Sequence, residues 1–534
     1  MKLLYLVIAV LASGIDSGVD VLAAKQDHTS YNYFTLRDVH GTAKMESVAQ
    51  ELGIEYVGRI GNLRYRLFRS PKGSNGIVER FHSLGLSHKY MVDDFQHDKP
   101  HKRTLLSREA ESDGFKMQWH LNEMDRGNDL NVKALWDKGI TGKGVTVAIL
   151  DDGVNFHHED LKENYSADSS YDFDSGTNNP YPHLEYNTHG TPCAGLVAAK
   201  RNGKCGSGVA YNANFSAIRL PMKVVTDSQD AIALNFKYQT NAIYSNSWGP
   251  GSNITETYPL SGVLKDALQH GADHGRNGKG SIFVFSSGNS AASSNNCGFV
   301  GYLNSIHTIT VGAVNKYDQH ISYAEGCSNL MITAYSSDPG YADIQTTAFR
   351  ESTCNGRFSG TSAAAPMVSG IIALILSERP ELNWRDVQHL LIRTARMVDP
   401  SHKSWRRTYS GRYFSTQYGY GVVDGEKILS FLPRYRLIER QVILQSQTIS
   451  KNADLEPSPL LSKQSYRDHI HITRTLLGPN KDMLLEHVLV NLNITHQCRS
   501  MLHIQLISPA KWSPISSSPG PETSPTKAST NTPY

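Results

Sequence analysis

The chain has 534 residues, which is room for roughly two to four domains. Hydrophobic residues make up 39% and charged residues 19%, with 43 glycines and 22 prolines. This globular composition excludes a collagen, a coiled coil or a wholly disordered chain. The 53 basic and 50 acidic residues give a formal net charge of +3, which argues against binding nucleic acid by neutralising its phosphates. We therefore expect no nucleic-acid partner.

The N-terminus predicts a secreted protein. Lys2 precedes an apolar run over residues 3–12 that is too short to span a bilayer and suits the core of a signal peptide. Small residues would allow cleavage after Gly14 or after Ala24, and the alternative is a buried N-terminal helix or strand. We assign residues 1–24 to a signal peptide and expect no transmembrane anchor. The expected location is the secretory pathway (Golgi lumen or vesicles) or the outside of the cell.

Cysteines and glycosylation sequons suit that compartment. The cysteines are widely spaced and form no Cys-x-x-Cys pair, so we do not expect zinc. They are Cys193, Cys205, Cys297, Cys327, Cys354 and Cys498. The sequons begin at Asn164, Asn214, Asn253 and Asn493, and only an exposed one would carry a sugar.

Residues 30–97 predict a small α+β unit. We expect strands over residues 33–39, 55–58 and 64–68 and a helix over residues 43–52. A basic stretch with a proline follows at residues 99–103, and Arg108 lies beyond it. Such a stretch is either a solvated linker or, between a signal peptide and a large domain, the place where a propeptide is cut.

Residues 115–430 alternate strands with helices, which predicts a parallel sheet covered on both faces. The runs 144–150, 281–285 and 306–311 are apolar and rich in β-branched residues, as buried parallel strands are. Residues 362–376 are apolar on nearly all sides and predict a buried central helix.

The pattern changes after residue 430. Residues 487–494 and 502–507 predict β-strands around a turn. Beyond Pro509 the chain is rich in serine, proline and threonine, and we expect this tail to be disordered because it has too little apolar surface to bury.

Three motifs carry candidate chemistry. Asp151 directly follows a predicted strand, at the sheet edge where α/β sites form, although it could be a solvated loop residue. His189 opens an apolar stretch, residues 193–199, that predicts a helix; a lone histidine is more often structural. Ser362 begins the central helix, where backbone amides favour an oxyanion, although serine is also a common N-cap.

Together these residues predict an acyl-transfer site. A serine nucleophile needs a base, and a histidine base needs a carboxylate to hold its tautomer. The order Asp, His, Ser along the chain is that of subtilisin. Asn289 follows another predicted strand and could donate to the oxyanion, a contribution of about 3–4 kcal/mol to the barrier.

The chain resembles the subtilisin-family serine endopeptidases and, among them, the kexin/furin proprotein convertases. The motifs that carry the resemblance are VAILDDG (147–153), NTHGT (187–191), GSGVAYN (206–212), YSNSWGP (244–250) and SGTSAAAP (359–366). The resemblance implies an α/β fold with a subtilisin-like parallel sheet flanked by helices, a small α+β propeptide before it and a partial β-sandwich, the P domain, after it.

The resemblance also implies domain boundaries. They are 1–24 for the signal peptide, 25–103 for a propeptide that inhibits the enzyme intramolecularly, 104–430 for the catalytic domain, 431–509 for the partial P domain and 510–534 for the disordered tail.

The resemblance implies roles for single residues as well. Asp151, His189 and Ser362 match the catalytic triad, and Asn289 matches the oxyanion asparagine. The implied disulfides are Cys205–Cys354 and Cys297–Cys327, which leaves Cys193 a thiol. Calcium is the implied cofactor, with Asp113, Asp160 and Asn202 as ligands of one site, together with backbone carbonyls near Ala199, Lys204 and Gly206, and Glu325 as a ligand of a further site. The implied substrates are proteins or peptides, contacted by Asp152, Ser247, Trp248, Gly249, Ser252 and Val300.

The substrate pockets depart from the family pattern. Convertases cut after paired basic residues, and a buried basic side chain without an acidic partner is costly. Ser252 and Val300 stand where the family has aspartates, so we expect strict dibasic specificity to be lost. The expected processing site, after Arg103, is a sequence that such a pocket should reject.

Two classes of function follow. The first is a secreted serine endopeptidase that hydrolyses protein substrates without strict dibasic specificity. The alternative is a non-catalytic or misfolded relative that acts as a binding protein or decoy. The presence of every residue needed for acyl transfer favours the enzyme, and labelling of Ser362 by a fluorophosphonate distinguishes the two.

Overall fold

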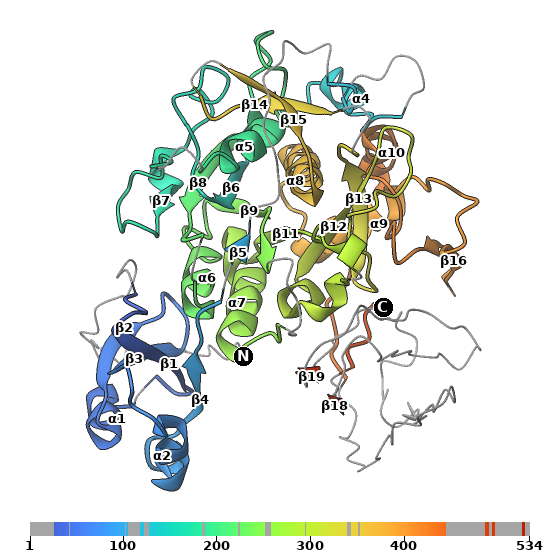
Figure 1. Cartoon of the computed structure of the whole chain (residues 1–534). Helices are drawn as coiled ribbons and strands as arrows, with labels where there is room; N and C mark the ends of the chain where they lie inside the picture. The colour runs from blue at the N-terminus through green and yellow to red at the C-terminus, as the bar shows by residue number, and fades with distance from the viewer. Residues whose placement is uncertain are drawn as a thin grey trace, which may run out of the picture.

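The computed structural model shows a small N-terminal unit packed against the helices of a larger parallel sheet (Figure 1). The described residues are 26–41, 43–101, 103–104, 118–121, 128–183, 187–222, 225–250, 258–293, 295–338, 343–350, 353–408, 410–444, 486–490, 494–496 and 526–528. The predicted signal peptide, Asp113, Ser252 and most of the predicted P domain and tail lie outside them.

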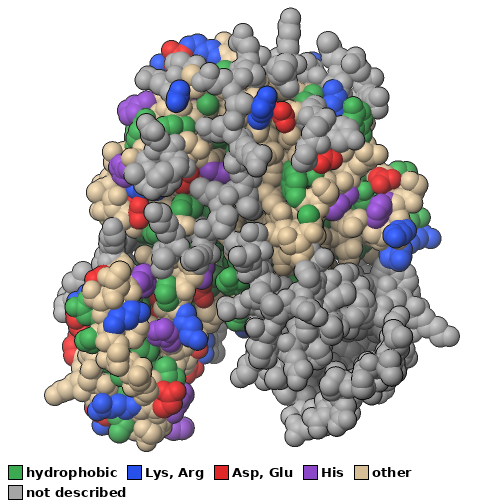
Figure 2. Space-filling view, viewed as in Figure 1, with side chains coloured by type: hydrophobic (Ala, Val, Ile, Leu, Met, Phe, Trp, Pro, Cys, Tyr) green, Lys and Arg blue, Asp and Glu red, His purple; other side chains and the backbone are tan. Residues whose placement is uncertain are grey.

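The N-terminal unit, residues 26–101, is an antiparallel sheet with helices, as the sequence predicts. Its strands lie in the order β2-β3-β1-β4. They are β1 (Tyr31–Asp38), β2 (Glu55–Arg59), β3 (Tyr65–Pro71) and β4 (Val92–Asp98), with helices α1 (Met45–Leu52), α2 (Ile77–Ser83) and α3 (Leu86–Tyr90). Phe34, Phe68, Phe81 and Phe95 form its own apolar core. Acidic, basic and histidine side chains are interspersed over its visible surface (Figure 2).

The larger unit is built on a seven-stranded sheet in the order β13-β12-β11-β9-β6-β8-β7. All neighbouring strands in it are parallel. They are β6 (Thr146–Asp151), β7 (Tyr171–Asp172), β8 (Asn214–Arg219), β9 (Asn241–Asn246), β11 (Ile282–Ser286), β12 (Thr308–Val314) and β13 (Leu330–Tyr335). The three strands predicted from apolar runs are β6, β11 and β12, and the predicted α/β class is confirmed.

Helices cover both faces of this sheet because successive strand residues point to opposite sides. In β6, Val147 and Ile149 join one apolar cluster, while Ala148 and Leu150 join another. The first cluster holds α4 (Lys133–Trp136), α5 (Gly190–Ala198), α8 (Thr361–Glu378), α9 (Trp384–Thr394) and α10 (Gly425–Phe431). The second holds α6 (Asp227–Ala233) and α7 (Gly262–Gly278), and it also takes in apolar residues of the N-terminal unit.

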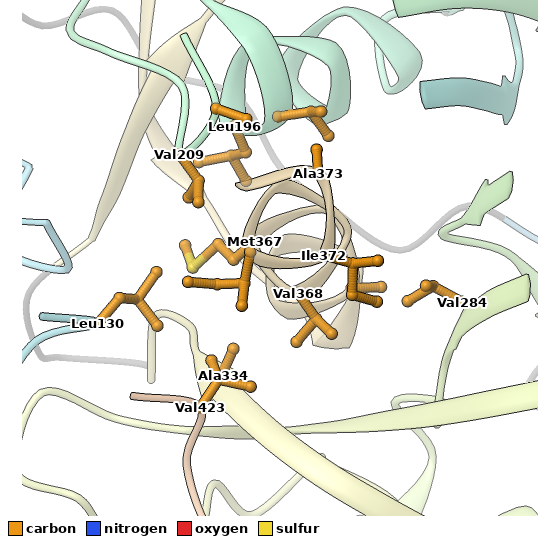
Figure 3. Packing of buried hydrophobic residues seen from close by; sticks show 14 of the residues in the cluster. Leu130, Leu196, Val209, Val284, Ala334, Met367, Val368, Ile372, Ala373 and Val423 are labelled. Atoms are coloured by element: carbon orange, nitrogen blue, oxygen red, sulfur yellow. The ribbon is translucent and has the colours of Figure 1, made fainter. Parts of the chain in front are cut away.

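Helix α8 is the predicted central helix. Met367, Val368, Ile372 and Ala373 project from it in different directions into the core (Figure 3). Among the described residues it is the one helix long and apolar enough to cross a membrane, but 89% of it is buried inside the protein. Its apolar composition is therefore explained by its place in the core.

The remaining elements are short. They are β5 (Arg103–Thr104), β10 (Gly249–Pro250), β14 (Ile344–Thr347), β15 (Cys354–Phe358), β16 (Arg406–Arg407), β17 (Tyr413–Phe414), β18 (Ile494–His496), β19 (Thr526–Ala528) and the 3-10 helices η2 (Ala167–Ser169), η3 (Ala291–Ser293), η4 (Cys297–Phe299), η5 (Gly301–Asn304) and η6 (Leu432–Arg434).

Two C-terminal predictions are corrected. Residues 487–490, expected to begin a strand, have no regular structure. Within the tail expected to be disordered, β19 pairs with β18. An apolar alternation forms a strand only where a partner strand completes its hydrogen bonds, and periodicity does not reveal the partner.

Candidate active site

The residues expected to carry catalysis come together at the carboxyl edge of the sheet. Asp151 is the last residue of β6, His189 is the N-cap of α5, and Ser362 lies in the first turn of α8. Gly360 has a φ of 84°, which glycine adopts readily, and it turns the chain from β15 into α8. All three side chains are buried, with exposed fractions of 1% for Asp151, 4% for His189 and 0% for Ser362.

Asp151 fixes the orientation of His189. The His189 Nδ1 atom lies 2.9 Å from Oδ1 and 3.0 Å from Oδ2 of Asp151, so Nδ1 carries the proton and donates it to the carboxylate. Burial by itself would lower the pKa of His189, but the Asp151 carboxylate raises it well above its ordinary value. This arrangement leaves Nε2 as the atom that can accept a proton.

The Ser362 hydroxyl is turned toward Ser247. Its Oγ donates to the backbone carbonyl of Ser247 at 3.0 Å. The His189 Nε2 atom is buried and has no hydrogen-bond partner within the described parts of the chain. The thiol of Cys193 lies 3.8 Å from His189 Nδ1 and 3.8 Å from the Ser362 carbonyl, so histidine and serine flank one sulfur.

A proline inside α8 explains the second contact between Ser247 and Ser362. Pro366 has no backbone N–H, so the carbonyl four residues earlier, that of Ser362, lacks its helical partner. The Ser247 hydroxyl donates to this carbonyl at 3.1 Å. The segment after β9 therefore holds Ser362 through both its hydroxyl and its backbone.

Asn289 is fixed to Thr361, the neighbour of Ser362. Its Oδ1 accepts the backbone N–H of Thr361 at 2.8 Å and the Thr361 hydroxyl at 2.7 Å. These contacts define which end of the amide is the acceptor, so Nδ2 is the donor end. An amide donor next to the first turn of α8 is suited to stabilise an oxyanion formed at Ser362.

Asp152, expected to contact substrate, is buried and bound to backbone. Its Oδ1 accepts the N–H of Gly190 at 2.7 Å and its Oδ2 accepts the N–H of His189 at 3.1 Å, at the start of α5. Its exposed fraction is 1%. Burial and the neighbouring Asp151 carboxylate raise the pKa of Asp152. The contacts it makes stabilise the helix start that carries His189.

Three of the residues predicted to contact substrate, Trp248, Gly249 and Val300, line one cavity, which we call the primary pocket. Its lining includes Trp248, Gly249, Val300, Tyr302, Leu303 and Glu325. Glu325, expected as a calcium ligand, has an exposed fraction of 4% and accepts the N–H of Ser290 at 3.1 Å. It is the one acidic residue among the described residues that line this pocket. Ser252 lies outside the described residues.

Two of the three side chains expected at the first calcium site lie together. The Asn202 amide donates to Oδ1 of the buried Asp160 at 2.8 Å, and the Cys205 N–H donates to Oδ2 at 3.0 Å. In the described residues, the donors to this carboxylate are neutral, and a cation would balance its charge. Rotation of the amide would bring the Asn202 oxygen to face Asp160. Asp113 lies outside the described residues, so the third ligand stays a prediction.

The structure contains the two disulfides that the family resemblance implies. Cys205 is bonded to Cys354 and Cys297 to Cys327, while Cys193 is a buried free thiol. Of the sequons, Asn164 is 3% exposed and its amide donates to the carbonyls of Ala198 and Tyr211, so a glycan there is incompatible with the fold.

Sequence reasoning missed how the basic stretch after the N-terminal unit meets the site. Arg103 and Thr104 form β5, which pairs antiparallel with β10, Gly249–Pro250. His101 also forms a bridge with Val225, just before α6. The structure pairs Arg103 and Thr104 with the segment that follows Trp248, and the cut after Arg103 stays a prediction. A strand of two residues has no periodicity from which it could have been predicted.

Comparison with known proteins identifies the family. Residues 142–421 match the model of the subtilase family, Peptidase_S8. The chain is 36% identical over 488 residues to mouse proprotein convertase subtilisin/kexin type 7, covering 88% of this chain and 62% of the relative. It is 39% identical to Saccharomyces cerevisiae kexin, and the match covers 74% of this chain and 48% of the kexin. It is 34% identical to Kluyveromyces lactis protease KEX1, and the match covers 94% of this chain and 68% of that protease.

Solved structures agree with the fold. A serine protease of Aeromonas sobria superposes with a TM-score of 0.62 at 22% identity, covering 75% of this chain and 79% of that one. Fervidolysin from Fervidobacterium pennivorans gives a TM-score of 0.55 at 18% identity, and the match covers 77% of this chain and 63% of fervidolysin. With the family model spanning the whole site and kexins matched over most of the chain, the protein belongs to the subtilase family, in its kexin-like branch.

Proposed function

We propose that this chain is a serine endopeptidase of the secretory pathway that cleaves protein substrates. The observation that carries the proposal is the buried Asp151–His189 pair next to Ser362 at the first turn of α8. The disulfides support an oxidising compartment, as does the apolar N-terminal run. The second reading, a non-catalytic relative, has no observation in the described residues that favours it.

In the proposed reaction, the Ser362 hydroxyl turns from the Ser247 carbonyl to His189 Nε2. Its Oγ attacks the carbonyl carbon of the scissile bond while Nε2 takes the proton. Asp151 stabilises the imidazolium, and Asn289 donates to the oxyanion. When the C–N bond breaks, Nε2 returns the proton to the leaving amine, and water then hydrolyses the acyl-enzyme by the same base.

We also propose that the N-terminal unit is an intramolecular inhibitor. It contacts the catalytic unit over α7, where Arg37 pairs with Asp266 at 3.5 Å, and over α6, where Ser228 donates to the buried Asp98. Because β5 pairs with β10 beside the nucleophile, the chain itself occupies the place of a substrate strand.

Calcium fits the site at Asp160 and Asn202. The residues that would hold it are Asp160, Asn202 and Asp113 together with backbone carbonyls, all of them oxygen donors of the kind that calcium prefers. A bound ion would supply a positive charge to the buried Asp160 carboxylate. It would thereby tie the loop of residues 199–206 to the chain before α5, without taking part in the reaction.

The experiment that tests the enzyme proposal is labelling by a fluorophosphonate. The secreted protein should react at Ser362, and the Ser362→Ala and His189→Ala variants should not, because the label needs both nucleophile and base. Ser377→Ala is the matched control, since Ser377 lies on the same helix and its hydroxyl donates within that helix, to the Leu374 carbonyl at 2.8 Å. A folded wild-type protein that takes no label would favour the binding-protein alternative.

A further inference from the structure

Two histidines lie one turn apart on α7. His270 and His274 are separated by four positions, which places them on the same face of the helix. Their ring centroids are 4.5 Å apart, with an angle of 23° between the ring planes. Neither residue belongs to the site described above or to the motifs that carry the family resemblance. The proposed function therefore gives this pair no role.

One hydrogen bond fixes the tautomer of His274. Its Nδ1 atom lies 3.1 Å from the backbone carbonyl oxygen of His270. A carbonyl oxygen only accepts, so Nδ1 carries the proton and Nε2 carries the lone pair. Histidines that bind metal ions donate their second ring nitrogen in this way, because the contact sets the tautomer and orients the ring. His274 is exposed, so an ion can reach it from solvent.

His270 offers a second nitrogen. Its Nε2 atom is buried and has no hydrogen-bond partner in the part of the chain that the structure describes. The Tyr238 ring packs edge-on against the His270 ring at a centroid distance of 5.2 Å, so this ring contacts both Tyr238 and His274. A buried polar atom without a partner costs free energy of desolvation, and binding an ion through the ring nitrogen would recover part of it.

The pair stands where the regular helix ends. Gly275 has a ψ of 154°, far from the helical value, so His274 is the last residue before the chain leaves the helical path. The Gln239 amide donates to the His274 carbonyl at 3.0 Å, and the Tyr238 carbonyl accepts the N–H of Arg276 at 3.1 Å. The C-terminal end of a helix carries partial negative charge, which favours a cation at this position.

These ligands suit a transition-metal ion such as Zn²⁺. Imidazole nitrogen is a preferred ligand of Zn²⁺, whereas Ca²⁺ and Mg²⁺ prefer oxygen. Two histidines at positions i and i+4 of one helix have the spacing that binds zinc in metalloproteases. The neighbouring Asp273 carboxylate accepts the Gln269 amide at 2.9 Å, so we expect water to complete the coordination. The cysteine spacing argues against a thiolate zinc site and does not bear on a site made of imidazoles.

We propose that the Nε2 atoms of His270 and His274 bind one Zn²⁺ ion at the end of α7. The ion would join two successive turns of the helix and stabilise the end from which the chain enters β11. This strand leads to Asn289, so the ion would support the element that carries the proposed oxyanion donor. The inference concerns binding and stability, and it stands whether or not the chain is an active protease.

The first test is the melting temperature of the full chain with and without Zn²⁺. All samples contain excess Ca²⁺, so that sites made of oxygen ligands are already filled. Zn²⁺ should raise the melting temperature of wild type but not that of His274→Ala, because an ion that binds only the folded protein stabilises it. The matched control is His88→Ala, which removes an exposed histidine of α3 and should respond to Zn²⁺ as wild type does. Equal responses in wild type and His274→Ala overturn the proposal.

The second test is the affinity for Zn²⁺, measured by titration calorimetry on the same proteins. His274→Ala should bind the ion roughly a hundredfold more weakly than wild type, because loss of one ligand turns a two-point attachment into a single contact. Since His274 is exposed, this variant should keep the fold. A wild type that binds no Zn²⁺ overturns the proposal. So does an unchanged affinity in His274→Ala, which would place the ion elsewhere, for example at the group formed by His101, Asp227 and Asp230.

Discussion

Replacing Asn289 by aspartate separates the two roles predicted for this side chain, which are to accept hydrogen bonds from Thr361 and to donate one to the oxyanion. The Oδ1 atom accepts two hydrogen bonds from Thr361, at 2.8 Å and 2.7 Å, and a carboxylate can accept both. The Nδ2 donor, however, becomes an oxygen. Loss of one oxyanion donor costs about 3–4 kcal/mol of transition-state stabilisation, or roughly a factor of 10²–10³ in kcat. The negative charge of the new carboxylate should increase this loss, because it would face the developing oxyanion.

The assay compares kcat, KM and the melting temperature of wild type, Asn289→Asp and Asn289→Ala. Asn289→Asp should lose kcat with little change in KM and melting temperature. Asn289→Ala should lose kcat and also stability, since it leaves two Thr361 donors without their acceptor at about 1 kcal/mol each. If Asn289→Asp keeps kcat within about threefold of wild type, the assignment of Asn289 to the oxyanion is wrong.

Three further predictions concern the base, the cation and the inhibitor. Because Asp151 raises the pKa of His189, activity should rise with pH through a midpoint above 6.5. The Asp151→Asn variant should shift this midpoint to lower pH and should strongly reduce kcat. A pH–rate profile with an unchanged midpoint would contradict this prediction. The Asp151–His189 pair stabilises the fold with the opposite pH dependence. The stabilisation is present at low pH, where His189 is protonated, and is lost as the pH rises through the pKa of His189 in the folded protein. The Asp151→Asn variant should therefore lose more stability at pH 5.5 than at alkaline pH. Chelation by EDTA should lower the melting temperature of wild type but not that of Asp160→Asn. Equal shifts in both proteins would show that the cation binds at a site other than Asp160. In Gly262→Ala the new Cβ would meet the Asp94 carboxylate and the Tyr65 hydroxyl, so both side chains must shift and the contact between the N-terminal unit and α7 should weaken. The melting temperature should therefore be lower than that of the exposed-site control Lys265→Ala, and equal melting temperatures would argue that this contact does not hold the N-terminal unit.

The fold could be predicted from sequence for segments that are buried on all sides along their whole length, because apolar composition alone identifies them. The apolar run that becomes β6 is buried on both faces, with its alternate residues in two different clusters, so composition alone marks it. Helix α8 is buried on all sides and shows no polar stripe, which also needs no partner to be identified. Asp151 and Ser362 were identified because each directly adjoins such a segment.

The remaining features depend on contacts between distant segments. The capping role of Asp152 requires the start of α5, which lies far along the chain, and its residue type equally suits a substrate contact. Burial raises the pKa of Asp98 to about 6 even though the hydrogen bond from Ser228 acts to lower it, yet the sequence around Asp98 is that of an ordinary edge strand. The strand predicted at residue 487 failed for the same reason, since its alternation could not say whether a partner was present.

The segment after β9 connects binding to catalysis. Ser247 accepts the Ser362 hydroxyl and donates to the Ser362 carbonyl, which Pro366 leaves without a helical partner. Two residues later the same segment becomes β10 and pairs with the chain's own β5. One short piece of backbone therefore holds Ser362 and also offers a strand edge for pairing. The proposed function accordingly predicts that specificity depends on the register of a paired strand as well as on the side chains that line the primary pocket.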